Sequence, residues 1–205
     1  MTEDTYSIPT EPIGSVPRPA ALREAAAALA AGTITCADYE AAVDAAVKET
    51  IEQFEATGSP VVTDGEQAKS SFANYTLEGL DNIAPDGVVI PFEDGHTRQL
   101  PRLTTGPFRY GVYAGSYLPR AKRFATRPLK QSVISPSAMS LLYPQDGIPG
   151  YTWEQFLDDL VTEAVADIRS CFDNGAQAIQ IDFTEGRLAV KLDPSRELLR
   201  QFVEL

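Results

Sequence analysis

Basic residues, histidine and cysteine are scarce in this chain, and their scarcity excludes several classes of function. The 205 residues contain 17 lysines and arginines against 29 aspartates and glutamates, for a formal net charge of −12. A nucleic-acid surface needs clustered Lys and Arg to neutralise phosphates. The one short basic cluster, between Arg120 and Lys130, is interpreted as a solvated face. We therefore expect no nucleic-acid partner.

The single histidine and the two cysteines do not make a disulfide framework or a zinc motif. Cys36 and Cys171 each fall inside a predicted helix, and His96 falls in a predicted loop over Gly95–Arg98. Because no histidine lies near either cysteine in sequence, the cysteines are interpreted as helix residues rather than nucleophiles. The chain by itself therefore predicts no metal ligands.

Long apolar runs are also missing. No run approaches the roughly 18 residues that cross a bilayer, and the acidic start at Met1–Tyr6 lacks the basic and apolar parts of a signal peptide. We therefore expect a cytoplasmic protein with no membrane partner. A content of 43% hydrophobic residues is enough for a core, and a chain of this length usually forms one domain.

Short β-rich runs alternate with longer helical runs, and this alternation predicts an α/β fold with parallel strands. The predicted helices cover residues 20–31, 35–57, 152–174 and 194–205, and the predicted strands cover residues 60–63, 132–134 and 178–181. Pro19 and Gly32 bracket the first helix, and Thr152 with Gln155 forms a capping-box pattern. In the third helix the predicted buried face is Phe156, Leu160, Ala164, Ile168 and Phe172.

Residues 81–130 are predicted to be an irregular excursion from this pattern. Val88–Ile90 and the aromatic-rich segment Phe108–Tyr117 favour strands, but prolines and glycines interrupt the whole stretch. The excursion lies inside a single predicted domain over residues 1–205.

Polar residues stand at the carboxyl ends of predicted strands, where functional side chains of parallel α/β proteins gather. The segments are Ile13–Ser15, Asp64–Glu66, Ser135–Ser137, and Asp182 with Glu185. Carboxylates together with backbone N–H groups suit a small zwitterion. Each segment also has a structural alternative: a turn at Asp64, a loop at Ile13–Ser15, and a helix cap or buried ion pair at Asp182.

Taken in order, these segments resemble the catalytic barrel of cobalamin-independent methionine synthase and its shorter single-barrel relatives. The matching pieces are Thr10–Ser15, Val61–Gln67, Thr97 with Arg98, Ser135 with Pro136, and Ala178–Arg187. They extend over most of the chain. The Gly-Glu and Ile-Gln-Ile-Asp elements are the most specific parts.

The resemblance implies a (β/α)8 TIM barrel, of which residues 1–205 are the N-terminal half with about four βα units. It also implies methyl transfer from a methyltetrahydrofolate to the sulfur of homocysteine, in methionine biosynthesis. The implied amino-acid site has the backbone of Ile13 and Ser15, with Glu66 and Asp182 on the ammonium group. The implied folate residues are Thr97, Arg98, Tyr143 and Glu185.

Two departures from the family are visible. Tyr143 stands where the larger enzymes tend to have tryptophan, and Phe183-Thr184 replaces an acid-proline step. The resemblance is therefore closer for the implied amino-acid site than for the implied folate site. The family holds zinc through His, Cys, Glu and Cys of later strands, and this chain has no His-x-Cys. Zinc is thus expected for the full-length family with ligands outside this chain, and the chain alone is expected to be inactive.

Two alternatives stay open. A decarboxylase of the uroporphyrinogen type shares a related barrel without the metal, and Asp64 or Asp182 would then hold pyrrole nitrogens. An arginine-rich loop near the N-terminus, suited to a multiply anionic substrate, is missing. The other alternative is a non-catalytic half-barrel that pairs with itself or with a separate C-terminal half to cover its open sheet edges.

Overall fold

A computed structural model describes residues 10–91, 95–183, 185–186, 189–190, 193 and 195–204. The chain divides into two compact units, each taken here by itself: residues 1–69, 115–132 and 171–180 form the first, and residues 70–114, 133–170 and 181–205 form the second. The predictions that concern Met1–Tyr6, Thr184, Arg187, Pro194 and Leu205 fall outside the described residues.

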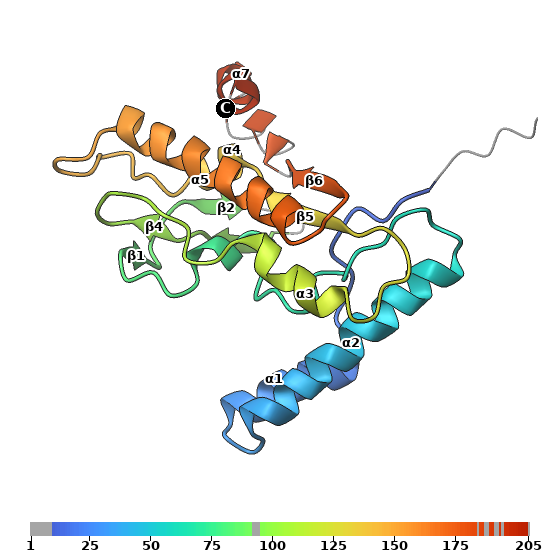
Figure 1. Ribbon diagram of the computed structural model, residues 1–205. Coiled ribbons are helices and arrows are strands. Elements are labelled where there is room, and N and C mark those ends of the chain that lie inside the picture. The colour runs from blue at the N-terminus through green and yellow to red at the C-terminus, as the bar shows by residue number, and fades with distance from the viewer. Residues whose placement is uncertain are drawn as a thin grey trace, which may run out of the picture. The chain divides into compact units, whose positions relative to one another are not determined.

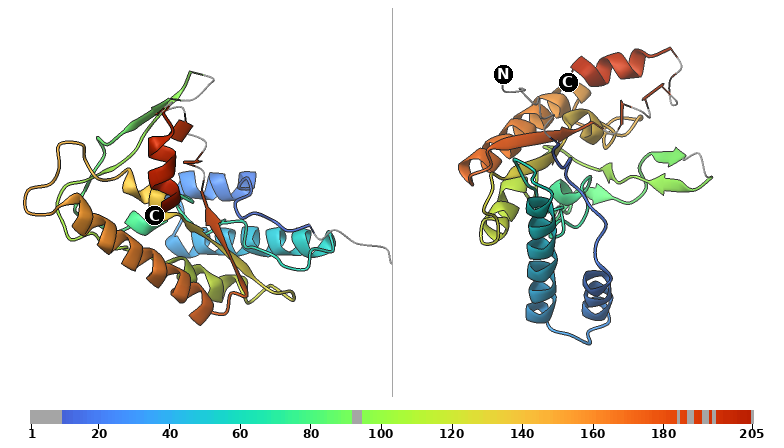
Figure 2. Two further views of the ribbon diagram at one scale, coloured as in Figure 1. Left: turned by 90° about the horizontal axis from the view of Figure 1, so that it is seen from above. Right: turned by 90° about the vertical axis from the view of Figure 1, so that its right-hand side faces the viewer.

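Two helices of the first unit, α1 (Ala20–Ala30) and α2 (Cys36–Ala56), lie side by side as an antiparallel hairpin (Figures 1 and 2). A capping box starts α2: the Thr35 hydroxyl accepts from the Asp38 N–H at 3.1 Å, and the Asp38 carboxylate accepts from the Thr35 N–H at 2.9 Å. These caps agree with the boundaries predicted from sequence, so both helices are confirmed.

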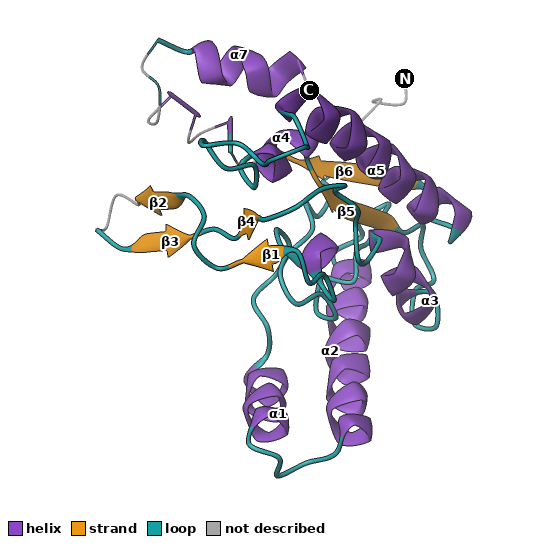
Figure 3. Ribbon diagram, turned by 90° about the vertical axis from the view of Figure 1, so that its left-hand side faces the viewer, coloured by secondary structure: helices purple, strands orange, loops and turns teal. Residues whose placement is uncertain are grey.

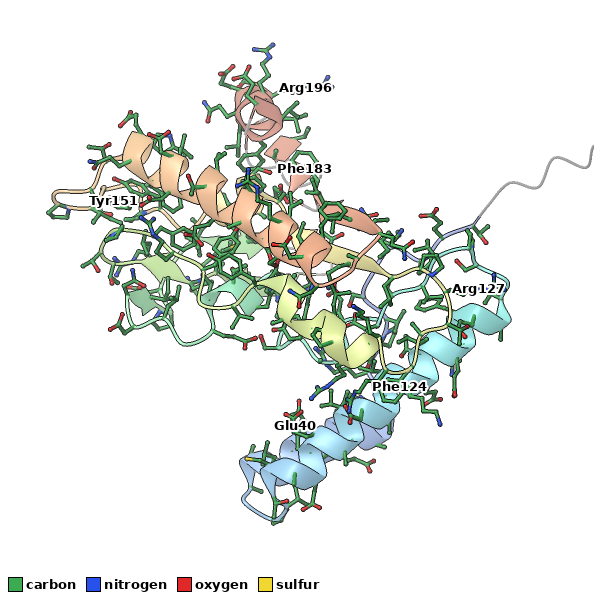
Figure 4. The ribbon with its side chains drawn as sticks, in the orientation of Figure 1. Glu40, Phe124, Arg127, Tyr151, Phe183 and Arg196 are labelled. Carbon is green, nitrogen blue, oxygen red and sulfur yellow. The ribbon has the colours of Figure 1, made fainter. Side chains whose placement is uncertain are left out.

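The inner face of α2 carries Val43, Val47 and Ile51, all buried at three- and four-residue spacing. The short helix α3 (Leu118–Ala121) packs against α2. Arg120 of α3 pairs with Glu40, labelled in Figure 4, and its Nε lies 3.0 Å from an oxygen of Asp44. Arg120 and Arg123 of the basic cluster therefore pair with acids of α2 in their own unit.

In the segment predicted as a strand over residues 60–63, Val61–Thr63 are buried, and one bridge is present among the described residues. Val62 pairs in parallel with Leu129, accepting from the Lys130 N–H at 2.8 Å and donating to the Pro128 carbonyl at 2.9 Å. The strand is shorter than predicted, because the chain turns immediately after Thr63, before a second pair of residues can bridge.

Two longer strands, β5 (Lys130–Ile134) and β6 (Ala178–Asp182), pair with each other. The Gln177 N–H donates to Leu129 and the Ser135 N–H donates to Asp182, so the pairing advances in the same direction along both strands. The strands predicted over 132–134 and 178–181 are confirmed. The helices and strands make a mixed α/β protein, and the count of four βα units stays a prediction.

The first part of the excursion, in the second unit, forms two short antiparallel pairs, β1 (Ile83–Ala84) with β4 (Arg102–Leu103), and β2 (Val89–Pro91) with β3 (Thr97–Gln99) (Figure 3). The strand predicted at Val88–Ile90 is confirmed in β2. The loop predicted over Gly95–Arg98 is wrong at Thr97 and Arg98, because their backbones pair with β2.

The strand predicted within Phe108–Tyr117 is wrong. Its last four residues form the 3-10 helix η2 (Ala114–Tyr117), and the preceding residues are irregular. The backbone N–H of Tyr110 donates to Glu163 at 3.0 Å, and that of Ala114 donates to Asp167 at 2.6 Å. Carboxylates of helix α5 (Trp153–Asp173) thus satisfy the amides that a strand partner would otherwise satisfy.

Aromatic rings pack at the start of α5. The Phe156 ring lies 5.4 Å from the ring of Phe108 and 5.3 Å from that of Tyr143, between centroids. The predicted capping box is present, with Thr152 and Gln155 bonded reciprocally at 2.9 and 3.3 Å. Tyr151, just before it, is labelled in Figure 4.

The predicted buried face of α5 is correct at its start and wrong at its end. Phe156 and Leu160 are fully buried, whereas Phe172 is 51% exposed. A spacing of four residues advances by about 40° beyond a full helical turn, so four such steps rotate the face by roughly 160°. Phe172 therefore points away from the side on which Phe156 packs.

The remaining elements are η1 (Tyr75–Leu77), α4 (Pro136–Ser140) and α7 (Glu197–Glu204). The Ser135 hydroxyl caps α4 by accepting from the Ala138 N–H at 3.2 Å. The helix predicted at the end of the chain is confirmed by α7. Among the helices described, none combines the length and apolar character needed to cross a bilayer.

Replacing Asp167 by asparagine is expected to destabilise the second unit. Asp167 is buried and accepts from both the Tyr75 hydroxyl and the Ala114 N–H. Hydrogen bonds to a charged group are worth about 1.5–3 kcal/mol, which corresponds to a fall in melting temperature of about 5 °C for a chain of this size. Calorimetry measures the fall. The exposed Asp158→Asn on the same helix is the control, and equal melting of both variants contradicts this role of Asp167.

Candidate functional site

A tight turn in the first unit places Glu66 in a strained conformation. The Asp64 carboxylate accepts from the Glu66 N–H at 2.8 Å, and Gly65 and Glu66 have φ angles of 66° and 58°. Only glycine adopts this left-handed region at no steric cost, and such outliers gather where function holds the chain. A Cβ on Gly65 would lie 2.6 Å from side-chain carbons of Thr50 and Val16. The turn therefore requires glycine at 65, and it orients Glu66 inward.

Three charged side chains are buried at this turn: Asp64 and Glu66 are each 3% exposed, and Lys69 is 1% exposed. The Lys69 ammonium lies 3.4 Å from a carboxylate oxygen of Glu66 and donates to the Ser132 carbonyl at 2.7 Å. Ionised groups are rarely buried this completely without a role, because burial removes their hydration. This cluster is the candidate site.

The segment Ile13–Val16 is fastened across the cluster by its backbone. The Ser132 hydroxyl donates to the Ile13 carbonyl at 3.2 Å, and the Thr63 hydroxyl donates to the Gly14 carbonyl at 3.2 Å. The Val16 N–H donates to the Gly65 carbonyl at 3.1 Å. The backbone position of this segment is therefore fixed relative to the Asp64–Glu66 turn.

Gly14 allows the segment to approach the cluster closely. A Cβ there would lie 2.1 Å from the Ser132 hydroxyl and 3.2 Å from a carboxylate oxygen of Glu66. The neighbouring Ile13 side chain is 71% exposed, and Ser15 is exposed as well. Of the predicted amino-acid site, Ile13, Ser15 and Glu66 thus lie together, with an exposed turn next to a buried carboxylate.

Asp64 is held in a setting that disfavours its charge. Burial raises the pKa of Asp64 above its ordinary value, and the nearby Lys69 only partly opposes this. Its Oδ2 atom is buried and has no hydrogen-bond partner among the described residues. The cluster thus contains two acids and one base, with an acid that is easily protonated.

A separate polar cluster lies in the second unit. Glu185 is 2% exposed, and one of its carboxylate oxygens accepts from the hydroxyls of Ser135 and Ser137. The other oxygen, Oε2, is buried without a hydrogen-bond partner in the described part of the chain. A buried carboxylate with a spare acceptor suits a ligand that presents an N–H group.

The other predicted site residues also lie in the second unit. Asp182 ends β6 as predicted, and its carbonyl accepts from the Ser135 N–H at 3.2 Å. Thr97 and Arg98 are exposed on β3, and the Arg98 guanidinium lies 6.0 Å from the centre of the Phe72 ring. Because Ser15 and Glu66 belong to the first unit, the predicted convergence with Asp182 stays a prediction.

Tyr143 borders a cavity of about 360 Å³ that also has Trp153, Leu198 and Phe202 in its wall. Its volume is within the range of small-molecule sites. Thr97, Arg98 and Glu185 are not among its lining residues. The structure therefore groups Tyr143 with an apolar cavity rather than with the other residues of the implied folate site.

The residues that the structure describes do not gather into a zinc site. Cys36 is exposed, Cys171 is buried, and among the described residues no three His, Cys, Asp or Glu side chains gather closely enough to hold a metal ion. Structural and catalytic zinc sites take three or four such ligands. No chemistry of this site is derived through a metal.

Sequence reasoning missed Lys69 and Ser132; it named Asp64, Ser135 and Ser137 as polar residues at strand ends but did not place them in the implied amino-acid or folate site. A lysine three residues after the Gly-Glu pair is the signal for Lys69, but in sequence it is indistinguishable from a surface lysine. The Ser132 contact joins residues 63 positions apart. Only folding brings them together.

The fold and the cluster together show the general class of this protein: it is a mixed α/β protein with a buried acidic site beside an exposed Gly-Ser turn. No protein-family profile matches the chain. The fold matches a solved B12-independent methionine synthase from Shewanella sp. W3-18-1, in complex with selenomethionine, with a TM-score of 0.68 at 16% identity. That alignment covers 96% of this chain and 58% of the other, and it shows a fold shared with these TIM-barrel enzymes.

Comparison with known sequences shows which proteins this chain is similar to. The methionine synthase of Sulfolobus acidocaldarius is 28% identical over 187 residues, which are 89% of this chain and 53% of that protein. The 5-methyltetrahydropteroyltriglutamate–homocysteine methyltransferase of Streptomyces griseus is 30% identical over 179 residues, 85% of this chain and 22% of that protein. The chain is a relative of the cobalamin-independent methionine synthases, spanning about half the length of the shorter one. The resemblance seen in the motifs is confirmed.

Replacing Asp64 by asparagine is expected to raise the melting temperature at pH 7. The folded-state pKa of Asp64 lies above its ordinary value of 3.8, so the wild type loses stability as the pH rises from that value through the raised pKa. Asparagine removes this loss. The gain should shrink to nothing as the pH falls to 4 and below, measured as melting curves between pH 4 and 8. A gain that does not vary with pH would disprove the charge-based explanation.

Proposed function

We propose that this chain is the N-terminal half, about four βα units, of a methionine-synthase-type barrel, and that its acidic cluster binds a thiol amino acid of the homocysteine class. One observation carries the proposal: the buried Glu66 carboxylate lies next to Gly14, which is flanked by the exposed residues Ile13 and Ser15. A small zwitterion on this turn would reach both a carboxylate and backbone N–H groups.

The hydrogen-bond acceptors of the cluster favour an ammonium group as the ligand. Glu66 is paired with Lys69, and the Oδ2 atom of Asp64 is buried without a hydrogen-bond partner among the described residues, so it can accept from an ammonium N–H. A charged hydrogen bond is stronger where water is excluded. The backbone N–H groups of Ile13–Ser15 would take the ligand carboxylate, and the assignment of Asp182 to the same ammonium rests on the resemblance alone.

The methyl donor of the proposed reaction is a folate, bound by residues of the second unit. Glu185 supports this assignment because its spare oxygen suits an N–H of a heterocycle. Tyr143 would offer an aromatic face from the cavity that it shares with Trp153. Thr97 and Arg98 are exposed on β3, where they would meet the polar part of the donor.

In this proposal Glu66 and Asp182 orient the amino acid and transfer no proton. Holding one reactant in position lowers the entropic part of a transfer barrier. Thiol activation is not assigned to this chain, because its described residues supply no metal site. The comparisons do not favour the decarboxylase alternative, since the named relatives are methionine synthases.

Replacing Glu66 by glutamine is expected to weaken binding of L-methionine or L-homocysteine by at least about 30-fold, because losing one partner of a buried charge pair costs 2 kcal/mol or more. Titration calorimetry measures the dissociation constants. The exposed Glu24→Gln on α1 is the matched control and should bind like the wild type. The analogue of methionine without its amino group should not bind. If it binds the wild type as tightly as methionine does, the assignment of Glu66 to the ammonium fails.

The purified chain alone is expected to form methionine from homocysteine and methyltetrahydrofolate only at background level. The physical reason is that a neutral thiol is a poor nucleophile near pH 7, and the described residues hold no metal site to ionise it. The measurement is methionine formation by chromatography, with the Sulfolobus relative as the active control. Turnover comparable to that of the control would show that the chain activates the thiol by itself, and would contradict this prediction.

A further inference from the structure

Lys69 lies beneath the proposed amino-acid site without reaching its surface. Its side chain is 1% exposed, and the Ser132 carbonyl and the Glu66 carboxylate surround its ammonium at 2.7 and 3.4 Å. A ligand at Ile13–Ser15 would meet Glu66, whereas Lys69 is almost fully buried and contacts that carboxylate. Any role of Lys69 in binding would therefore act through Glu66.

The backbone around Lys69 is also held in place. The Arg18 guanidinium donates to the Lys69 carbonyl and, at 3.5 Å, to the Glu66 carbonyl. The Lys69 N–H donates to the Glu66 carbonyl at 3.3 Å. These bonds fix residues 66–69 as one turn, so the ammonium and the carboxylate have little freedom to separate.

The charge balance explains why a lysine is needed there. Asp64 and Glu66 are both buried within a three-residue turn, and two neighbouring carboxylates in a dry site cannot both stay ionised without a cation. Among the described residues, Lys69 and, after it, Arg120 favour the charged form of Asp64. The Lys69 ammonium also contacts the Glu66 carboxylate directly.

We propose that Lys69 is a positioning residue for the amino-acid site: its buried ammonium keeps the Glu66 carboxylate ionised and directed at the turn around Gly14. This inference rests on the proposed function for the nature of the ligand. The effect on Glu66 itself does not depend on any ligand.

The test uses two variants that remove the charge in different ways. Lys69→Gln keeps a donor for the Ser132 carbonyl, whereas Lys69→Met removes the donor as well. In carbon NMR titrations of the full chain, with the Glu66 signal assigned by Glu66→Gln, both variants should raise the midpoint of the Glu66 carboxyl by more than about one pH unit. A midpoint that stays at the wild-type value in both overturns the proposal.

The binding experiment measures the affinity for L-methionine by calorimetry from pH 4 to 8. Both variants should bind several-fold more weakly than the wild type at the acidic end of this range, where Glu66 is protonated in the variants only, and the deficit should shrink as the pH rises and Glu66 ionises. A deficit that is constant with pH indicates a purely structural role and overturns the proposal. If the wild type binds no amino acid, the proposed function fails while the NMR result still decides the role of Lys69.

A compensating variant separates charge from packing. Adding Asp64→Asn to Lys69→Gln removes one acid together with the base, so Glu66 no longer competes with a neighbouring carboxylate. The Glu66 midpoint in the double variant should return at least halfway to the wild-type value. A midpoint unchanged from that of Lys69→Gln shows that the charge of Asp64 does not act on Glu66 and contradicts the charge balance proposed here. Melting curves of all variants confirm that the comparison is made on folded protein.

Discussion

Two carboxylates and one ammonium share a site from which water is almost excluded, and the structure of the first unit follows from satisfying them. Lys69 lies within reach of the Glu66 carboxylate, and the Glu66 N–H donates to one oxygen of Asp64, so part of the cost of burying these two acids is offset. The left-handed turn, the close approach of Gly14 and the contact with Ser132 are the geometric means by which this is achieved.

A related solution occurs independently in the second unit. Glu163 and Asp167 of α5 accept backbone N–H groups from the segment that includes Tyr110 and Ala114, which has no strand partner there. In both units carboxylates hold irregular backbone in place. The difference lies in access: Asp167 is enclosed by its own hydrogen bonds, whereas Glu66 stands next to an exposed turn. This difference is why only the first cluster is proposed to bind an amino acid.

Much of the local structure was predictable from neighbouring residues. Thr35 with Asp38 and Thr152 with Gln155 mark helix starts, and Gly65 marks a turn, because these effects act within a few residues. The aromatic segment after Phe108 was mispredicted because β propensity describes side chains on a pleated surface, and here those side chains pack against α5 instead. The exposure of Phe172 was mispredicted because a four-residue spacing drifts around the helix.

The sequence by itself determined the helices, the glycine turns and the order of motifs that relates this chain to the methionine synthases. Tertiary structure alone decided that Lys69 is a buried partner of Glu66 and that Ser132 meets both Lys69 and the backbone of Ile13. The physical reason is that capping and turn geometry depend on adjacent residues, whereas the free energy of a buried charge depends on groups that only folding brings near it.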